Sequence, residues 1–169
     1  MINKLILLFH SKSYWLGLII LSLCFEAVAL FYQYGLEYYP CVLCIHARIW
    51  VLGIMLVAIF AFLNYKNSIS LLLSKIAMTL IMAGLFERSY QLLGTERGFI
   101  DGSCSMDSGL PSWFALDEWF PLMFQVWEPC GYTPELLFGV TMAEALIVIS
   151  FSLLLVNIAL TVSHFFRKK

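Results

Sequence analysis

The five cysteines of this 169-residue chain are the residues best suited to chemistry, and their spacing divides them into different kinds. Cys41 and Cys44 form a C-x-x-C motif, whereas Cys104 and Cys130 stand far apart and Cys24 lies in an apolar stretch. A disulfide across two intervening residues closes a small, easily strained ring, so it is reduced more readily than a structural disulfide. The motif therefore favours thiol–disulfide redox chemistry.

Three other uses of these cysteines compete with redox chemistry. A zinc site could use Cys41, Cys44 and His46, but no second close pair of ligands follows, so we expect no metal. Covalent haem attachment needs a histidine directly after the second cysteine, and Ile45 stands there instead. Two purely structural disulfides would also account for four cysteines. That last alternative stays open from the residues alone.

Arg48 follows Cys44 by four residues, which places the two side chains one turn apart on one face of a helix. A guanidinium group there would stabilise a Cys44 thiolate, the reactive form of a thiol. The alternative is that Arg48 extends to the lipid headgroups and has no chemical role. The neighbouring C-x-x-C motif favours the functional interpretation.

The composition shows what kind of scaffold must position these residues. Hydrophobic residues make up 62% of the chain and charged residues 12%, against roughly 45–50% and 25% in soluble domains. A soluble globule of this length cannot bury so much apolar surface. The net charge of -1 provides no basic patch for nucleic acid. The composition predicts a single integral membrane domain over residues 1–169, in contact with the lipid bilayer.

Four apolar stretches are long enough to cross a bilayer, which takes about 20 residues. They cover residues 14–34, 45–63, 69–86 and 142–166. We therefore expect an all-α membrane protein, a bundle of four transmembrane helices with outer loops at 35–44 and 87–141.

The basic residues predict the orientation of the bundle, because Lys and Arg are enriched on the cytoplasmic side. Both termini and the turn after the second span carry seven of them: Lys4, Lys12, Lys66, Lys75, Arg167, Lys168 and Lys169. The opposite side carries Arg48, Arg88 and Arg97. We expect both termini in the cytoplasm and four cysteines outside, with Cys24 a small buried apolar residue in the first span. Ala27 and Ala29 resemble a signal-peptide cleavage site, but the apolar run continues past them, so we expect no cleavage.

The long outer loop contains a segment suited to the membrane surface. Residues 112–124 place apolar side chains at helical spacing, and Trp113 and Trp119 are suited to the interface, which predicts a short amphipathic helix on the bilayer. Two carboxyl groups also fall within spans. We expect Glu26 to make a hydrogen bond between helices and Glu144 to lie near the outer surface in contact with water.

Three motifs together resemble the disulfide bond formation protein B family, quinone-linked thiol oxidases of bacterial inner membranes. The first is Pro40-Cys41-Val42-Leu43-Cys44-Ile45 followed by Arg48; the second is Pro111-x-Trp113 with Leu116-Asp117-x-Trp119-x-Pro121; the third is Phe138-Gly139-x-x-Met142. The chain departs from the family pattern at Ala115 and Ala143, where many members have proline.

The resemblance implies a function and a set of partners. A ubiquinone or menaquinone would bind near Cys44 and Arg48, with Met142 lining the pocket. A reduced, DsbA-like periplasmic thiol oxidase would attack Cys104. Cys130 would then attack Cys41, and Cys44 would pass electrons to the quinone, which sustains disulfide formation in exported proteins. The reactive cysteines would face the periplasm.

Two rival interpretations remain at this level. An enzyme similar to vitamin K epoxide reductase also couples a C-x-x-C motif to a quinone, but its motif sits late in the chain. A four-span scaffold with structural disulfides would bind no quinone, and its disulfides would resist mild reductants.

Overall fold

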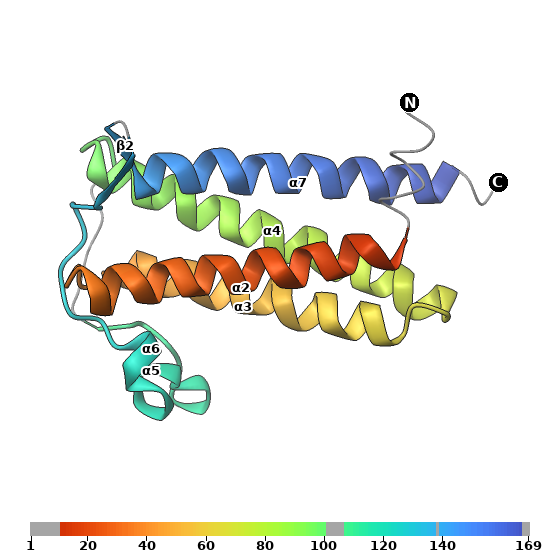
Figure 1. Ribbon diagram of the computed structural model, residues 1–169, viewed down its shortest axis with the longest axis horizontal. Coiled ribbons are helices and arrows are strands. Elements are labelled where there is room, and N and C mark those ends of the chain that lie inside the picture. The colour runs from red at the N-terminus through yellow and green to blue at the C-terminus, as the bar shows by residue number, and fades with distance from the viewer. Residues whose placement is uncertain (1–10, 101–106, 138, 167–169) are drawn as a thin grey trace.

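The computed structural model describes residues 11–100, 107–137 and 139–166. Four long helices, α2 (Lys12–Gly35), α3 (Val42–Leu63), α4 (Ser68–Glu96) and α7 (Met142–Phe166), lie side by side as a bundle (Figure 1). Helix α2 packs on α3, α3 on α4, and α4 on α7. All four helices are long and apolar enough to span a membrane. The predicted all-α membrane bundle is confirmed.

The helices extend beyond the predicted spans because apolar composition marks only the part suited to lipid. Helix α3 begins at Val42 rather than at residue 45, and α4 continues to Glu96 rather than ending at residue 86. In lipid, a helix satisfies its own backbone hydrogen-bonding groups, and nothing forces it to end where the polar residues begin. The last part of α4 therefore continues toward the long loop.

The interior of the bundle is filled by a few large side chains and many small ones. Trp15, Met78 and Met82 are fully buried, and α3 presents Ala58 and Ala61 to its neighbours. Small residues let membrane helices approach closely. The outward faces carry exposed apolar side chains, among them Leu56, Leu63, Leu80 and Val148, as lipid contact requires.

The two ends of the bundle differ. The start of α2, the turn between α3 and α4, and the end of α7 lie at one end (Figure 1). The other end holds the 36–41 connection and the loop between α4 and α7, so Cys41, Cys44 and Cys130 share it. Cys104 lies outside the described residues, as do the basic residues Lys4 and 167–169 used to predict orientation.

The amphipathic segment expected at 112–124 consists of three single turns. They are the 3-10 turn η1 (Ser112–Phe114), α5 (Leu116–Trp119) and α6 (Pro121–Phe124). The second break has a clear cause, because a residue that precedes proline is pushed out of the α region, and Phe120 has φ -134° and ψ 64°. Trp113 is 77% exposed.

A short hairpin that the sequence analysis did not predict leads into α7. Strand β1 (Glu135–Leu137) pairs antiparallel with β2 (Val140–Thr141), and Glu135 lies opposite Thr141. Gly139, with φ 77°, provides the left-handed residue that the tight turn needs. Figure 1 shows β2 at the end of the bundle where α7 begins.

Candidate functional site

The C-x-x-C motif is built into the first turn of α3. Cys41 is the N-cap residue, and its Sγ accepts a hydrogen bond from the backbone N–H of Cys44 at 3.3 Å. The two sulfur atoms lie 2.6 Å apart. The N-terminus of a helix favours negative charge, so this position suits a thiolate in either cysteine. Cys41 is only 2% exposed, whereas Cys44 is partly exposed.

A third sulfur reaches this pair from the long loop. Cys130 packs against a buried cluster that contains Cys41, Leu92 and Ala143. A hydrogen bond with Cys130 lowers the pKa of the Cys41 thiol, but its hydrogen bond with Cys44 and its burial outweigh that effect and hold the pKa above the ordinary value. Burial and the contact with Cys44 therefore favour the thiol form of Cys41. The structure brings together three of the four cysteines that the sequence analysis selected.

Backbone and side-chain contacts hold the loop both before and after Cys130. Before it, the backbone N–H of Trp127 donates to the Pro40 carbonyl at 3.1 Å, and the Trp127 ring stacks on Tyr39. After it, Thr133 Oγ1 donates to Glu96 Oε2 at 2.8 Å. These contacts attach the loop both to the segment before α3 and to the end of α4.

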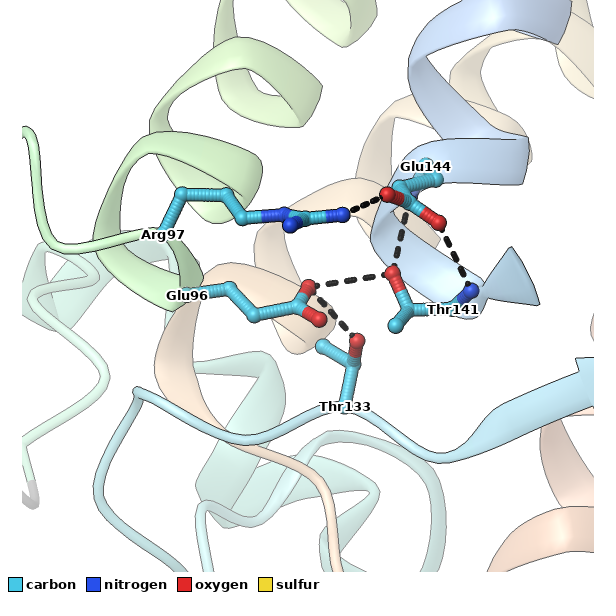
Figure 2. A network of polar contacts seen from close by, with 5 residues as sticks. All are labelled: Glu96, Arg97, Thr133, Thr141 and Glu144. Carbon is cyan, nitrogen blue, oxygen red and sulfur yellow. Dashed lines mark hydrogen bonds and ion pairs between the residues drawn. The ribbon is translucent and has the colours of Figure 1, made fainter. Parts of the chain in front are cut away.

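Figure 2 shows that Glu96 is the centre of a wider polar network. Its Oε2 also accepts from Thr141 Oγ1 at 3.2 Å, at the end of β2. Glu144 accepts from the Thr141 backbone N–H at 3.1 Å and forms an ion pair with Arg97. We call Glu96, Arg97, Thr133, Thr141 and Glu144 the outer clamp. It ties the end of α4, the Cys130 loop and the start of α7 together.

Arg48 is not a side chain that extends to the headgroups. It is 8% exposed, and its guanidinium donates to Gln33 Oε1 at 2.6 Å, to the Met123 carbonyl at 2.9 Å and to the Ala29 carbonyl at 3.2 Å. Its charge interacts with Cys44 across the site. Three fixed acceptors hold a cation beside the C-x-x-C motif, as the helical spacing predicted.

A cavity of about 210 Å³ opens beside Cys44, between α2, α3 and α7. Arg48 and Met142 line it together with Cys44, so the three residues expected at a cofactor site face one space. Its other walls are mainly apolar and aromatic: Phe25, Val28, Tyr32, Val51, Leu146 and Ile149 are among them. An apolar cavity with one buried cation suits a lipid-soluble ring that carries polar oxygens.

Glu26 also lines this cavity, and the expectation for it is wrong. We expected a hydrogen bond between helices, but neither carboxyl oxygen has a hydrogen-bond partner among the described residues, although Glu26 is only 7% exposed. Helix α2 turns the side chain toward the cavity instead of toward a polar group on a neighbouring helix.

The expectations for the other two spanning residues have different outcomes. Cys24 is exposed rather than buried, because α2 turns it to the outside of the bundle. Glu144 lies in the first turn of α7 and is partly exposed, and it forms an ion pair with Arg97.

Several site residues were missed by sequence reasoning. Gln33 was a detectable signal, because it is the one amide in an otherwise apolar stretch of the first span. It holds Arg48 and also donates to the Leu122 carbonyl at 3.3 Å. Glu96 and Thr133 gave no such signal, since their partners are far away in sequence. His46, considered as a metal ligand, instead contacts the Ser108 carbonyl at 2.8 Å.

Comparison with known sequences adds to this geometry. A family model described as "Disulfide bond formation protein DsbB" matches residues 11–160. A protein named "Disulfide bond formation protein B" from Shewanella frigidimarina is 33% identical over 137 residues, 80% of each chain. The protein of that name from Haemophilus influenzae is 33% identical over 161 residues, 90% of this chain and 86% of its own. One from Photobacterium profundum is 27% identical over 160 residues, 94% and 91%.

Proposed function

Because the chain belongs to the DsbB family of disulfide bond formation proteins, we propose that it is a quinone-dependent protein thiol–disulfide oxidoreductase. It oxidises a DsbA-like periplasmic thiol oxidase and passes the electrons to a membrane quinone. The observation that carries the proposal is the meeting of Cys41, Cys44 and Cys130 beside an apolar cavity with a buried cation.

The electron path begins at a disulfide between Cys104 and Cys130. A thiolate of the reduced partner attacks Cys104 Sγ and breaks that bond, which frees Cys130 as a thiolate. Cys130 then attacks Cys41 Sγ of the Cys41–Cys44 disulfide, and the electron pair leaves on Cys44. The second partner thiol attacks the mixed disulfide and releases the partner oxidised, with Cys104 as the leaving thiolate. Cys104 then attacks Cys130 Sγ, which restores the Cys104–Cys130 disulfide and frees Cys41. The position of Cys130 beside Cys41 supports this order.

The thiolate left at Cys44 is stabilised by two features of the chain. The N-terminus of α3 favours negative charge there, and the Arg48 guanidinium lies nearby. Quinone, when bound, supplies the sink for two electrons and two protons. Arg48 and Met142 are the residues that would hold it, since both line the cavity together with Cys44. The mainly apolar walls exclude water from the reacting groups.

We place the protein in the bacterial inner membrane, with both termini in the cytoplasm and the reactive cysteines in the periplasm. In the sequence, seven of the ten Lys and Arg residues fall at the termini or around the turn after the second span, which supports this orientation. Single cysteines at Lys66, in the α3–α4 turn, and at Gln125, in the long loop, test it in a chain without the native cysteines. Both positions are exposed. An impermeant thiol reagent should label only the Gln125 position in intact cells. Labelling at Lys66 instead would reverse the orientation.

The function is tested with the purified protein in lipid nanodiscs. Reduced thioredoxin-fold oxidase is added with either a ubiquinone or a menaquinone analogue, and quinone absorbance and partner thiols are followed together. We expect one quinone reduced for each disulfide formed in the partner, with the two arms identifying the preferred quinone. Disulfides that persist in mild reductant, with no quinone reduced in either arm, would instead indicate a structural scaffold.

A further inference from the structure

We propose that Glu26 is the proton donor of the quinone site: its carboxyl group lines the cavity and delivers one of the two protons that the bound quinone takes up. This inference rests on the proposed function. It assigns a catalytic role to a residue that the cysteine relay itself does not use.

The position of Glu26 is the first observation. Its side chain comes from α2 and faces the cavity that Cys44, Arg48 and Met142 also line. The residue is 7% exposed. A group on the cavity wall is within reach of an occupant, whereas water is not abundant in a space lined mainly by apolar side chains.

The second observation is that the Glu26 carboxyl group makes, within the part of the chain that the structure describes, no hydrogen bond that would hold the helices together. Among the described residues neither Oε1 nor Oε2 accepts or donates a hydrogen bond. A buried polar group without a partner destabilises the fold by about 1–3 kcal/mol. By contrast, Gln33, two turns further along the same helix, is fully used by Arg48 and the Leu122 carbonyl. An orphaned carboxyl group facing a cavity is typical of a functional group rather than a structural one.

The third observation is the relation between Glu26 and Arg48. The two charges interact through space, but Arg48 directs its hydrogen bonds to Gln33, Met123 and Ala29. Arg48 therefore leaves the carboxyl oxygens open toward the cavity, and its charge is close enough to stabilise the carboxylate that remains after the proton has left. The other titratable groups that face the cavity are Cys44, Tyr32, Tyr38, Tyr39 and Tyr132.

The balance of the reaction requires such a donor. Oxidation of the Cys41 and Cys44 thiols to a disulfide releases two electrons and two protons, and the quinone takes up the same number of each. Because Cys44 reacts as a thiolate, its proton has already been lost, so one proton must come from another group. Glu26 supplies it from a carboxyl oxygen and is reprotonated by water from the periplasmic side. That water enters where Tyr38 and Tyr39 of the 36–41 connection line the cavity.

The test compares Glu26→Gln and Glu26→Asp with Glu118→Gln, the same chemical change at an exposed position on the loop. Quinone reduction is driven by a small dithiol that reduces Cys41–Cys44 directly. General acids contribute roughly 100- to 10,000-fold, so we expect Glu26→Gln to lower kcat by about 100-fold with KM little changed. Glu26→Asp should restore part of the rate, and Glu118→Gln should match the wild type.

A second readout does not depend on turnover. Infrared spectra of the quinone-free protein should contain a protonated-carboxyl band that is absent in Glu26→Gln and present in Glu118→Gln. With quinone bound, that band should bleach during reduction of the site. A structural role for Glu26 would leave the band unchanged through the reaction and would overturn the inference.

The proposed function and this inference fail in different ways. Exchange between Cys130 and Cys41 should proceed at the wild-type rate in Glu26→Gln, which also shows that the variant is folded. If Glu26→Gln reduces quinone as fast as the wild type, Glu26 is not the donor and the cysteine relay still stands. If the wild-type protein reduces no quinone, both proposals are wrong.

Discussion

The two segments that carry the cysteines of the proposed relay are built in opposite ways. Cys41 and Cys44 belong to the first turn of a long membrane helix, and their geometry comes from that turn and from the bundle around it. Cys130 lies in a loop that is held by a few side-chain and backbone contacts, chiefly the outer clamp and the Trp127–Pro40 hydrogen bond. One site is fixed by secondary structure and the other by separate tethers.

This difference teaches how a relay can have one rigid and one adaptable half. A loop held by few hydrogen bonds opens at a lower free-energy cost than a helix within a packed bundle. In the proposed relay, Cys130 pairs with Cys104 at one stage and with Cys41 at another, which requires movement. Cys41 and Cys44 must instead remain beside a cavity and a cation. The two constructions suit these two tasks.

The most direct test of this difference replaces one cysteine in each half. Cys44→Ser should abolish quinone reduction by either the partner protein or a small dithiol, because the thiolate beside Arg48 is lost. Cys130→Ser should abolish only the partner-driven reaction, since a dithiol reaches Cys41–Cys44 directly. Quinone absorbance with each donor measures both. Equal loss of the dithiol-driven reaction in the two variants would show that the halves are not separable.

Replacing Arg48 tests whether the rigid half works through charge. Loss of a charge-assisted hydrogen bond costs about 1.5–3 kcal/mol, so Arg48→Met should lower quinone-dependent turnover by roughly 10- to 100-fold. Arg48→Lys should retain part of the rate, because it keeps the charge but not the planar arrangement of donors. Mixed-disulfide formation at Cys104, measured in a single turnover, should not change. Wild-type turnover in Arg48→Met would show that Arg48 is not the polar group that holds the quinone in the cavity.

A substitution in the outer clamp should have a smaller effect, and it tests the adaptable half. Glu96→Gln keeps an oxygen acceptor for Thr133 and Thr141 but removes its charge, which weakens two hydrogen bonds by about 1 kcal/mol each. We expect the rate of Cys41–Cys130 disulfide formation to fall by about fivefold, since only part of that energy holds Cys130. The assay follows formation of this disulfide with an added thiol oxidant, in a chain with Cys44 and Cys104 replaced by serine.

Glu87→Gln is the matched control for the clamp. It makes the same change earlier in α4, where Glu87 forms an ion pair with Arg88 and accepts a hydrogen bond from Gln91. In Glu87→Gln, the Cys41–Cys130 disulfide should form at the same rate as in the protein with the native glutamate. If Glu87→Gln and Glu96→Gln slow its formation equally, the loop is not positioned by the clamp.

The smallest effect is expected at Cys24, which faces outward from α2 and belongs to neither half. Cys24→Ser should change the free energy of unfolding by less than about 0.5 kcal/mol, as is usual for exposed positions. Thermal unfolding and partner-driven quinone reduction should both match the wild type. A loss of electron transfer would bring a fifth cysteine into the relay.

The sequence predicted what depends on local pattern and missed what depends on distant contacts. Apolar runs located all four helices, and helical spacing placed Arg48 near Cys44. The same logic failed at Cys24 and Glu26, because length and hydropathy do not reveal which way α2 is rotated in the bundle. Glu96 and Thr133 meet although they are 37 positions apart in the chain, and no local pattern encodes such a pairing.

The capping role of Cys41 has a consequence for backbone dynamics. While its sulfur accepts the Cys44 amide proton, that amide is protected from exchange with solvent deuterium. In the proposed relay, a covalent bond from Cys41 to Cys130 draws the sulfur from hydrogen-bond distance to bonding distance of the loop, which weakens the cap on the first turn of α3. Oxygen caps stabilise a helix by about 0.5–2 kcal/mol, and a sulfur cap is weaker because sulfur is a weaker acceptor. The beginning of α3 should therefore fray when electrons arrive and tighten when they leave, so that the Cys44 amide exchange rate reports the redox state.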